Sequence, residues 1–282
     1  MRIRIIGTWS WWTVLVGALT TSTSTEPLAA QDELPGVSLG LVYANTYLPA
    51  LAVQPFVGAF GGDVIASQVE AIVGRDLRNS DQFEVIDSLP AAMVGSHVDY
   101  PLWDRLGAVW LVAGEVEASG DGYMLTVELH DVVYGEVRDR GRFKLPSQDD
   151  DDFRMSVHRT SDEIVRWATG APGMAASRIA FTMVGNDGNK EVYVIDSDGE
   201  DLRQVTDYNS LTESPTWSPD GSRLAIASYK TGVPRIYEVD RFGNELSALP
   251  AVRGPGDYVT PTYHPDGKTL AFSVFGLSLI HI

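Results

Sequence analysis

The chain has 282 residues, 44% of them hydrophobic and 21% charged, which is the composition of a globular protein long enough for two domains. Its formal net charge of −17 gives a surface that repels phosphate backbones, so we expect no nucleic-acid partner. The absence of cysteine excludes disulfides, thiolate metal sites and cysteine nucleophiles.

The first 30 residues have the layout of a secretory signal peptide. Arg2 and Arg4 precede an apolar stretch, and small and polar residues then lead to Ala30, the expected cleavage site. An uncleaved membrane anchor is the alternative, but the apolar stretch is shorter than the roughly 20 residues that a spanning helix needs. We therefore expect an exported mature protein that starts at Gln31 and has no membrane span.

Residues 36–40 match the Gly-x-Ser-x-Gly pattern of serine hydrolases, with Ser38 at the position of the nucleophile. A nucleophile elbow needs a strand before it, a helix after it, and acid and histidine partners downstream on an α/β sheet. The match instead follows the expected cleavage site and precedes a predicted strand. A chance match in a glycine-rich chain explains it better, and we expect no catalytic residue.

Residues 31–170 show mixed α and β patterns and are predicted to form an α/β (α+β) domain. Strands are expected at 51–56 and 83–86, and a hairpin at 109–116 and 123–129. The glycines between 58 and 63 have neither Walker nor dinucleotide spacing, so they indicate a plain turn. The helix that follows has one apolar face, made of Ile65, Val69, Ile72, Val73 and Leu77.

Four consecutive aspartates at 149–152 could be a metal or partner site, but they favour a solvated helix start, where acidic groups meet the positive end of the helix dipole. The predicted helix ends at Gly170 and Pro172 and is followed by a linker at 171–176. Its expected apolar stripe consists of Phe153, Val157, Ile164 and Ala168.

The five histidines are scattered without metal-ligand spacing, and each is expected to be a surface or turn residue. They are His97, His130, His158, His264 and His281.

Residues 177–282 contain a repeat of about 45 residues. The segment 214–221, Ser-Pro-Thr-Trp-Ser-Pro-Asp-Gly, returns at 260–267 as Thr-Pro-Thr-Tyr-His-Pro-Asp-Gly, and each copy precedes a short apolar strand. Proline, aspartate and glycine favour a tight turn between strands. The repeat motif residues are Trp217, Pro219, Asp220 and Gly221, and then Tyr263, Pro265, Asp266 and Gly267.

Further strands are predicted at 191–196 and 235–240, each before a glycine turn. Three or four short strands per repeat describe the blades of a β-propeller with WD40-like PD40 repeats, whereas a β-sandwich needs no fixed period. Residues 196–201 resemble part of a calcium loop but lack its full ligand spacing, so they indicate a hairpin tip.

These features together resemble the TolB family, the periplasmic propeller proteins of the Tol-Pal system. Besides the Pro-Asp-Gly repeats, the resemblance rests on Asp-Leu-Arg-Asn-Ser at 76–80, on Leu-Gly-Ala at 106–108, and on Thr-Gly-Ala-Pro-Gly at 169–173. It covers essentially the whole expected mature chain.

The resemblance implies a periplasmic protein without cofactor, metal or small-molecule substrate. Such a protein binds the peptidoglycan-associated lipoprotein with its propeller and contacts TolA through its N-terminal segment, in support of outer-membrane integrity, cell division and protein import. Here that segment would include Leu39, Leu41, Tyr43 and Asn45, where the family has a more Asp-rich strand. The family builds six blades, so two full repeats and one strand predict a C-terminally truncated propeller.

The alternative is the front part of a propeller-containing serine peptidase, a class in which similar repeats cover an α/β-hydrolase domain. An α/β domain ahead of the repeats is explained by the TolB resemblance and not by the peptidase one.

Overall fold

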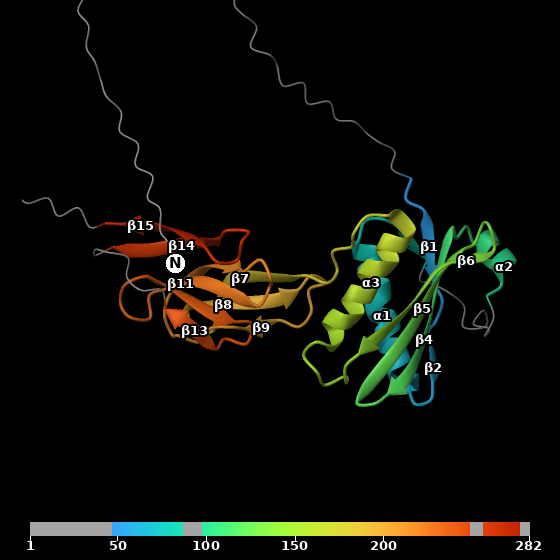
Figure 1. The fold of residues 1–282 in the computed structure, drawn as a ribbon, viewed down its shortest axis with the longest axis horizontal. Helices are drawn as coiled ribbons and strands as arrows, with labels where there is room; N and C mark the ends of the chain where they lie inside the picture. The colour runs from blue at the N-terminus through green and yellow to red at the C-terminus, as the bar shows by residue number, and fades with distance from the viewer. Residues whose placement is uncertain (1–46, 87–97, 249–255, 277–282) are drawn as a thin grey trace, which may run out of the picture. The chain divides into compact units, whose positions relative to one another are not determined.

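The computed structural model describes residues 47–86, 98–248 and 256–276 (Figure 1). The expected signal peptide at 1–30, the Ser38 pattern and the proposed partner segment with Leu39, Leu41, Tyr43 and Asn45 therefore lie outside the described residues. All described helices and strands fall in one compact unit, Leu48–Ile282. No helix of the described residues is long and apolar enough to cross a membrane.

The α/β region contains one sheet with the strand order β3-β1-β4-β5-β6, to which β2 adds by pairing with β4. Strand β1 runs parallel to β3 and β4, whereas β4, β5 and β6 form an antiparallel meander. The strands are β1 (Ala50–Val53), β2 (Val57–Ala59), β3 (Glu84–Ile86), β4 (Trp110–Ser119), β5 (Gly122–Asp131) and β6 (Glu136–Leu145).

These strands refine the predicted ones. The strand expected at 51–56 is interrupted by Pro55, which has no backbone N–H to donate to the sheet, and pairing resumes at β2. The predicted hairpin is present, with β4 starting at Trp110, one residue later than predicted, and with both strands longer toward the turn. Strand β6 was not predicted, because its run of charged residues hides the alternation that marks a half-buried strand.

Helices α1 (Asp63–Asn79) and α3 (Phe153–Thr169) cover one face of this sheet, and the short α2 (Tyr100–Arg105) precedes β4 (Figure 1). The predicted apolar face of α1 is confirmed, since Val69, Val73 and Leu77 are fully buried. Helix α3 presents Phe153, Val157 and Ile164 to the same core. It ends at Gly170, which adopts a left-handed φ of 77° as expected for a C-terminal cap.

The repeat region forms three antiparallel sheets, and the predicted propeller fold class is confirmed, although the described residues do not close into a ring. The first sheet contains β7 (Arg178–Val184), β8 (Lys190–Asp196) and β9 (Arg203–Gln204). The second contains β10 (Thr212–Trp217), β11 (Arg223–Ser228), β12 (Arg235–Asp240) and β13 (Glu245–Ala248). The third contains β14 (Asp257–Tyr263) and β15 (Leu270–Phe275).

The sheets pack face to face, as blades do. Val192 and Val194 of the first sheet meet Leu224 and Ile226 of the second in one buried cluster. On the other face of the second sheet, Ala225, Ala227 and Ile236 pack against Tyr258 of the third. The second sheet is therefore buried on both faces, which explains the apolar run of residues 224–227 in the middle of β11.

The two repeat motifs adopt the same backbone geometry. The Gly221 N–H donates to Ser218 O at 2.8 Å, and the Gly267 N–H donates to His264 O at 2.9 Å, with φ of 68° and 66° at the two glycines. In each turn the aspartate accepts backbone N–H bonds, Asp220 from Ser222 and Asp266 from Lys268 and Thr269. Both turns are therefore tight hairpin connections, as the Pro-Asp-Gly sequence predicts.

Candidate functional site at the α/β and repeat junction

Ion pairs connect the two helices of the α/β region to the turn that follows β8. The Arg154 guanidinium of α3 lies 2.6 Å from Asp198 Oδ2 and 3.4 Å from Asp196 Oδ2. Arg75 of α1 reaches the same Asp198 at 3.4 Å and Glu200 at 2.9 Å. The Asp196 and Asp198 side chains are 2% and 1% exposed, so these carboxylates depend on their arginine partners to offset desolvation.

His158 of α3 lies at the centre of this junction and is fully buried. Its Nδ1 lies 2.8 Å from Asp76 Oδ2, and its Nε2 lies 3.7 Å from Asp196 Oδ2. Burial alone would lower the pKa of His158, but the interactions with Asp196 and Asp76 outweigh burial and raise that pKa to about 9. The imidazole is therefore protonated at neutral pH and lies between one carboxylate from each region.

The aspartates at the start of α3 belong to the same network. The Arg241 guanidinium, from the turn after β12, lies 2.6 Å from Asp152 Oδ1 and 3.1 Å from its Oδ2. Arg203 of β9 pairs with Asp151 at 2.9 Å. The predicted helix start is confirmed, and the Asp151 and Asp152 side chains remain 53% and 41% exposed, as expected for a solvated start. The ion pairs with arginines distant in sequence were not predicted.

The linker at 171–176 is held from both sides. The Asp162 carboxylate of α3 accepts the backbone N–H of Ala175 at 2.7 Å and that of Ala176 at 3.0 Å. Ser197, after β8, donates its hydroxyl to Ala175 O at 2.6 Å. A Cβ at Gly173 would lie 2.6 Å from the Asp162 Cα, so this close approach requires glycine.

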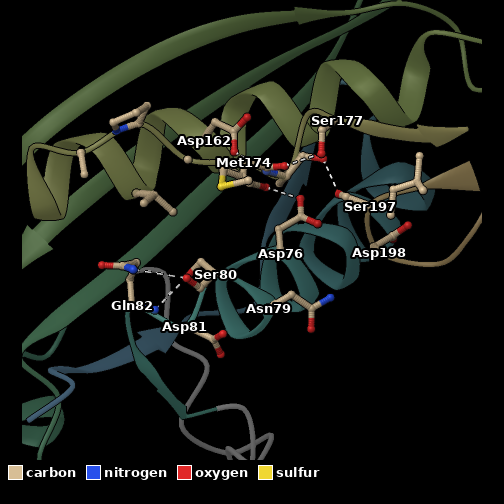
Figure 2. Close-up of a pocket in the computed structure, with 17 residues that line it drawn as sticks. Asp76, Asn79, Ser80, Asp81, Gln82, Asp162, Met174, Ser177, Ser197 and Asp198 are labelled. Carbon is tan, nitrogen blue, oxygen red and sulfur yellow. Dashed lines mark hydrogen bonds between the residues drawn. The ribbon is translucent and has the colours of Figure 1, made fainter. Parts of the chain in front are cut away.

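A cavity of about 490 Å³ opens beside this linker, between α1, α3 and the turn after β8 (Figure 2). Its walls carry the carboxylates of Asp76, Asp162 and Asp198 together with the apolar Met174 and Ile179. Asp76 Oδ1 is buried and makes no hydrogen bond within the described residues. The lining residues thus combine carboxylates and hydroxyls with apolar groups, and none of them is a lysine or arginine.

Asp76, His158 and Asp198 could be considered metal ligands, because one possible ligand atom of each lies within 4.8 Å of the others. The imidazole must lose its proton before it can coordinate a metal, and its raised pKa opposes that loss. Asp198 Oδ2 already accepts from Arg154. The chemistry of these groups therefore fits an ion-pair junction better than a metal centre.

The same residues do not form a hydrolytic triad. The Ser161 hydroxyl donates to Asp76 Oδ2 at 2.6 Å, so it is bonded to the carboxylate and not to the imidazole. A nucleophilic serine needs a histidine nitrogen within hydrogen-bond reach as its base, and the Ser161 hydroxyl is instead bonded to Asp76 Oδ2 and Val157 O. Ser161 is therefore a hydrogen-bond partner that orients Asp76.

Two histidines overturn the prediction that each would be a surface or turn residue. His158 is buried at the junction, and His130 of β5 is 3% exposed, with Nδ1 at 2.9 Å from the Tyr100 hydroxyl and Nε2 at 3.1 Å from Glu128. His264 does lie exposed in a turn. His97 and His281 are outside the described residues. The sequence contains no signal for these two buried histidines. The partners of His158, Asp76 and Asp196, are distant in sequence, and the partner of His130, Glu128, looks like an ordinary polar strand residue.

The repeat motif residues occupy turns and inter-sheet contacts. Trp217 packs against the cluster between the first and second sheets. The Tyr263 hydroxyl donates to Glu238 Oε1 at 2.6 Å and so connects the third sheet to the second. Pro219, Asp220, Pro265 and Asp266 lie in exposed turns. These positions do not converge on the junction cavity.

Comparison with known proteins finds two family models that match successive parts of the chain. A family model described as the TolB amino-terminal domain matches residues 42–137, and one described as the TolB beta propeller domain matches residues 159–280. The Tol-Pal system protein TolB of Albidiferax ferrireducens is 33% identical over 216 residues, which cover 76% of this chain and 48% of that protein. The Jannaschia protein of the same name is 30% identical and is covered to 52%.

Among solved structures, TolB from Acinetobacter baumannii superposes with a TM-score of 0.64 at 25% identity, over 81% of this chain and 55% of that one. The chain spans about half the length of the curated relatives it matches. Because both TolB family models match in the order that the fold displays, this chain belongs to the TolB family.

Proposed function

We propose that this protein is a non-catalytic periplasmic interaction protein of the Tol-Pal system. In this proposal the repeat region binds the peptidoglycan-associated lipoprotein, and the N-terminal segment that includes Leu39, Leu41, Tyr43 and Asn45 contacts TolA. The protein would thereby support outer-membrane integrity and cell division. The observation that carries the proposal is the succession, in one chain, of a TolB amino-terminal domain and TolB propeller repeats.

The junction supports a non-catalytic role. Its buried polar side chains are used in ion pairs between the two regions, and its serine is bonded to a carboxylate and not to the histidine, so the two lack the geometry for nucleophilic attack. The alternative, the front part of a propeller-containing serine peptidase, is disfavoured because an α/β domain of TolB type precedes the repeats.

Binding can be tested with the 282-residue chain and the purified soluble domains of the two proposed partners. We expect the chain to retain the peptidoglycan-associated lipoprotein in a pull-down. Deleting residues 31–46 should remove the association with TolA and leave that with the lipoprotein. No association with either partner would contradict the proposal.

The absence of catalysis and the export step have separate tests. If the chain hydrolysed an ester or peptide substrate and Ser38→Ala abolished that activity, the hydrolase alternative would replace the interaction proposal. N-terminal sequencing of periplasmic material should begin at Gln31. Recovery of the intact N-terminus in the membrane fraction would instead support an uncleaved anchor.

A further inference from the structure

Strand β6 is a long edge strand. It pairs with β5 from Glu136 to Leu145, and within the described residues no strand pairs with its other side. The backbone N–H and C=O groups on that side are therefore available to a further strand. Proteins usually avoid long exposed edge strands by keeping them short, covering them or interrupting them. The side chains around β6 therefore indicate whether this edge prevents association with other chains or receives a partner strand.

The side chains of β6 give this edge a basic row. Arg140, Arg142 and Lys144 alternate along the strand and pair with consecutive same-face positions of β5, while Arg138 lies at a bulge just before them. All four side chains belong to exposed residues. Alternate residues of a strand are spaced by about 6.5–7 Å, so the cations match the spacing of alternate side chains on a neighbouring strand. In a chain of net charge −17, this row stands out.

The basic row is only weakly engaged by the protein itself. Arg140 pairs with Glu128 of β5, and Arg142 lies 2.9 Å from Glu117 of β4, with both arginine side chains more than 60% exposed. Exposed pairs of this kind contribute little to stability, because water solvates and screens both charges. Lys144 makes no ion pair within the described part of the chain. Carboxylates on a new neighbouring strand could therefore share these cations at little cost.

The opposite face of the same edge carries an aromatic pair, with Asp139 on this face nearer the start of β6. The rings of Phe143 on β6 and Trp167 on α3 lie 6.1 Å apart and are both partly exposed. They cover Gly141, where a Cβ would come within 2.7 Å of the Phe143 ring and 2.9 Å of the Trp167 ring. A strand that added to β6 would thus place one set of side chains beside the basic row and the alternate set beside this aromatic pair.

We propose that β6 is a docking edge for an extended protein segment in which acidic residues alternate with apolar residues. The segment adds to the sheet as a strand next to β6, its carboxylates face Arg140, Arg142 and Lys144, and its apolar side chains contact Phe143 and Trp167. Backbone pairing supplies affinity and the alternating side chains supply selectivity, as in other cases of strand addition. This inference does not depend on the partners named in the proposed function.

The competing explanation is that charges on β6 only prevent self-association of the sheet edge. The two explanations differ in a direct experiment. The probe is a fluorescently labelled nine-residue peptide of alternating glutamate and valine, titrated with the 282-residue chain and followed by anisotropy. We expect saturable binding that weakens several-fold between 50 and 300 mM salt, because the carboxylate contacts are exposed to solvent. A peptide of alternating lysine and valine should not bind.

Variants locate the site. Arg142→Glu with Lys144→Glu should weaken binding of the glutamate peptide at least tenfold and allow binding of the lysine peptide. The matched control, Lys190→Glu with Lys268→Glu, makes the same change in net charge at exposed residues of the repeat region and should leave binding unchanged. Circular dichroism of both variants should match the parent chain, since neither changes a buried residue.

A peptide that is N-methylated at alternate residues tests strand addition itself, because it keeps every side chain and loses half of its backbone donors. We expect it not to bind. Equal binding of the methylated peptide, or equal loss of binding in both double variants, would overturn the proposal. So would absence of glutamate-peptide binding combined with self-association of the Arg142→Glu and Lys144→Glu chain, which is the outcome that edge protection predicts. Binding of anionic phosphatidylglycerol vesicles but not of the peptide would also overturn it.

Discussion

Helices α1 and α3 make apolar contacts on the side that faces the sheet and ion pairs on the side that faces β8. Toward the sheet they present Val69, Leu77 and Ile164, which are fully buried in an apolar core. Toward β8 they present Arg154, His158 and Asp76, which meet the carboxylates of Asp196 and Asp198. Apolar packing is non-directional and tolerates volume-conserving substitutions, whereas a buried ion pair needs both partners in place. The junction should therefore respond to single charge deletions, pH and linker geometry in ways that the core does not.

The largest effect is expected from Asp196→Ala. Asp196 is almost fully buried and faces Arg154, Arg178 and His158, so its removal leaves cations without their carboxylate. Breaking a buried pair on one side costs about 3–5 kcal/mol in the free energy of unfolding. Urea unfolding of the parent and variant chains measures this cost, and a change below 1 kcal/mol would show that the junction is solvated in solution.

A double variant tests whether the His158 and Asp196 side chains are energetically coupled. In the double variant Asp196→Ala with His158→Leu, the central cation is removed together with its carboxylate. We expect the double variant to lose less stability than the sum of the two single changes, because the interaction between His158 and Asp196 is lost only once, although His158→Leu also leaves Asp76 without its cation. If the two changes simply added, the His158 and Asp196 side chains would not be energetically coupled.

The pH dependence of stability is the next largest effect. The folded-state pKa of His158 is raised to about 9, above the unfolded value of about 6.5, so protonation favours the folded state. This contribution is fully present below pH 6.5 and is lost as the pH rises through 9. It amounts to about 3 kcal/mol, since each pKa unit corresponds to about 1.4 kcal/mol.

Urea unfolding at pH 6.5, 8 and 9.5 tests this dependence, and the slope should vanish in His158→Gln. His130 acts in the other direction, because burial lowers its pKa and its protonation favours unfolding. The titration of His130 changes the free energy of unfolding only at and below pH 6.5, so it cannot be mistaken for the loss expected from His158 at higher pH. A chain equally stable at pH 6.5 and 9.5 would contradict the geometry of the His158 pairs.

A smaller effect is expected from the linker. Gly173→Ala brings a methyl group against the Asp162 backbone, so the linker must shift away from the carboxylate that accepts from Ala175 and Ala176. Overpacking of this kind costs about 1–3 kcal/mol. Gly74→Ala is the control, because a Cβ at this position in α1 meets nothing within 4 Å, and it should stabilise the chain by about 0.5–1 kcal/mol. Thermal unfolding should give the lowest melting temperature for Gly173→Ala, a higher one for the parent chain and the highest for Gly74→Ala.

The sequence was informative wherever the structure depends on local pattern. The apolar spacing of α1, the glycine cap of α3 and the two Pro-Asp-Gly turns each involve residues close together in the chain, and all were predicted. The residues 196–201 were likewise correctly interpreted as a hairpin tip. In each case the backbone conformation depends on residues close together in the chain, so the sequence pattern is sufficient to predict it.

The junction could not be predicted in the same way. Asp76, His158 and Asp196 come from three elements, and each looks like an ordinary polar residue in its own segment. Asp151 and Asp152 do lie at a solvated helix start, but their ion pairs were missed, because Arg203 and Arg241 lie on later strands and turns. Only the packing of the repeat region beside α3 reveals these partners.

The smallest effect is expected from Arg166→Ala, which tests an exposed ion pair on the helix that also carries the buried pairs of the junction. Arg166 pairs with Glu163 one turn away on α3, and both side chains are exposed. Water solvates either charge when its partner is removed, so an exposed pair on one helix contributes little and is screened by salt. We expect no measurable change in the urea midpoint at 150 mM salt, although Arg166 and Arg154 lie on the same helix. Arg154→Ala under identical conditions should lower the midpoint clearly, because Asp198 would be left buried with only the more distant Arg75. Equal responses of the two arginines would show that burial does not distinguish the junction from the surface.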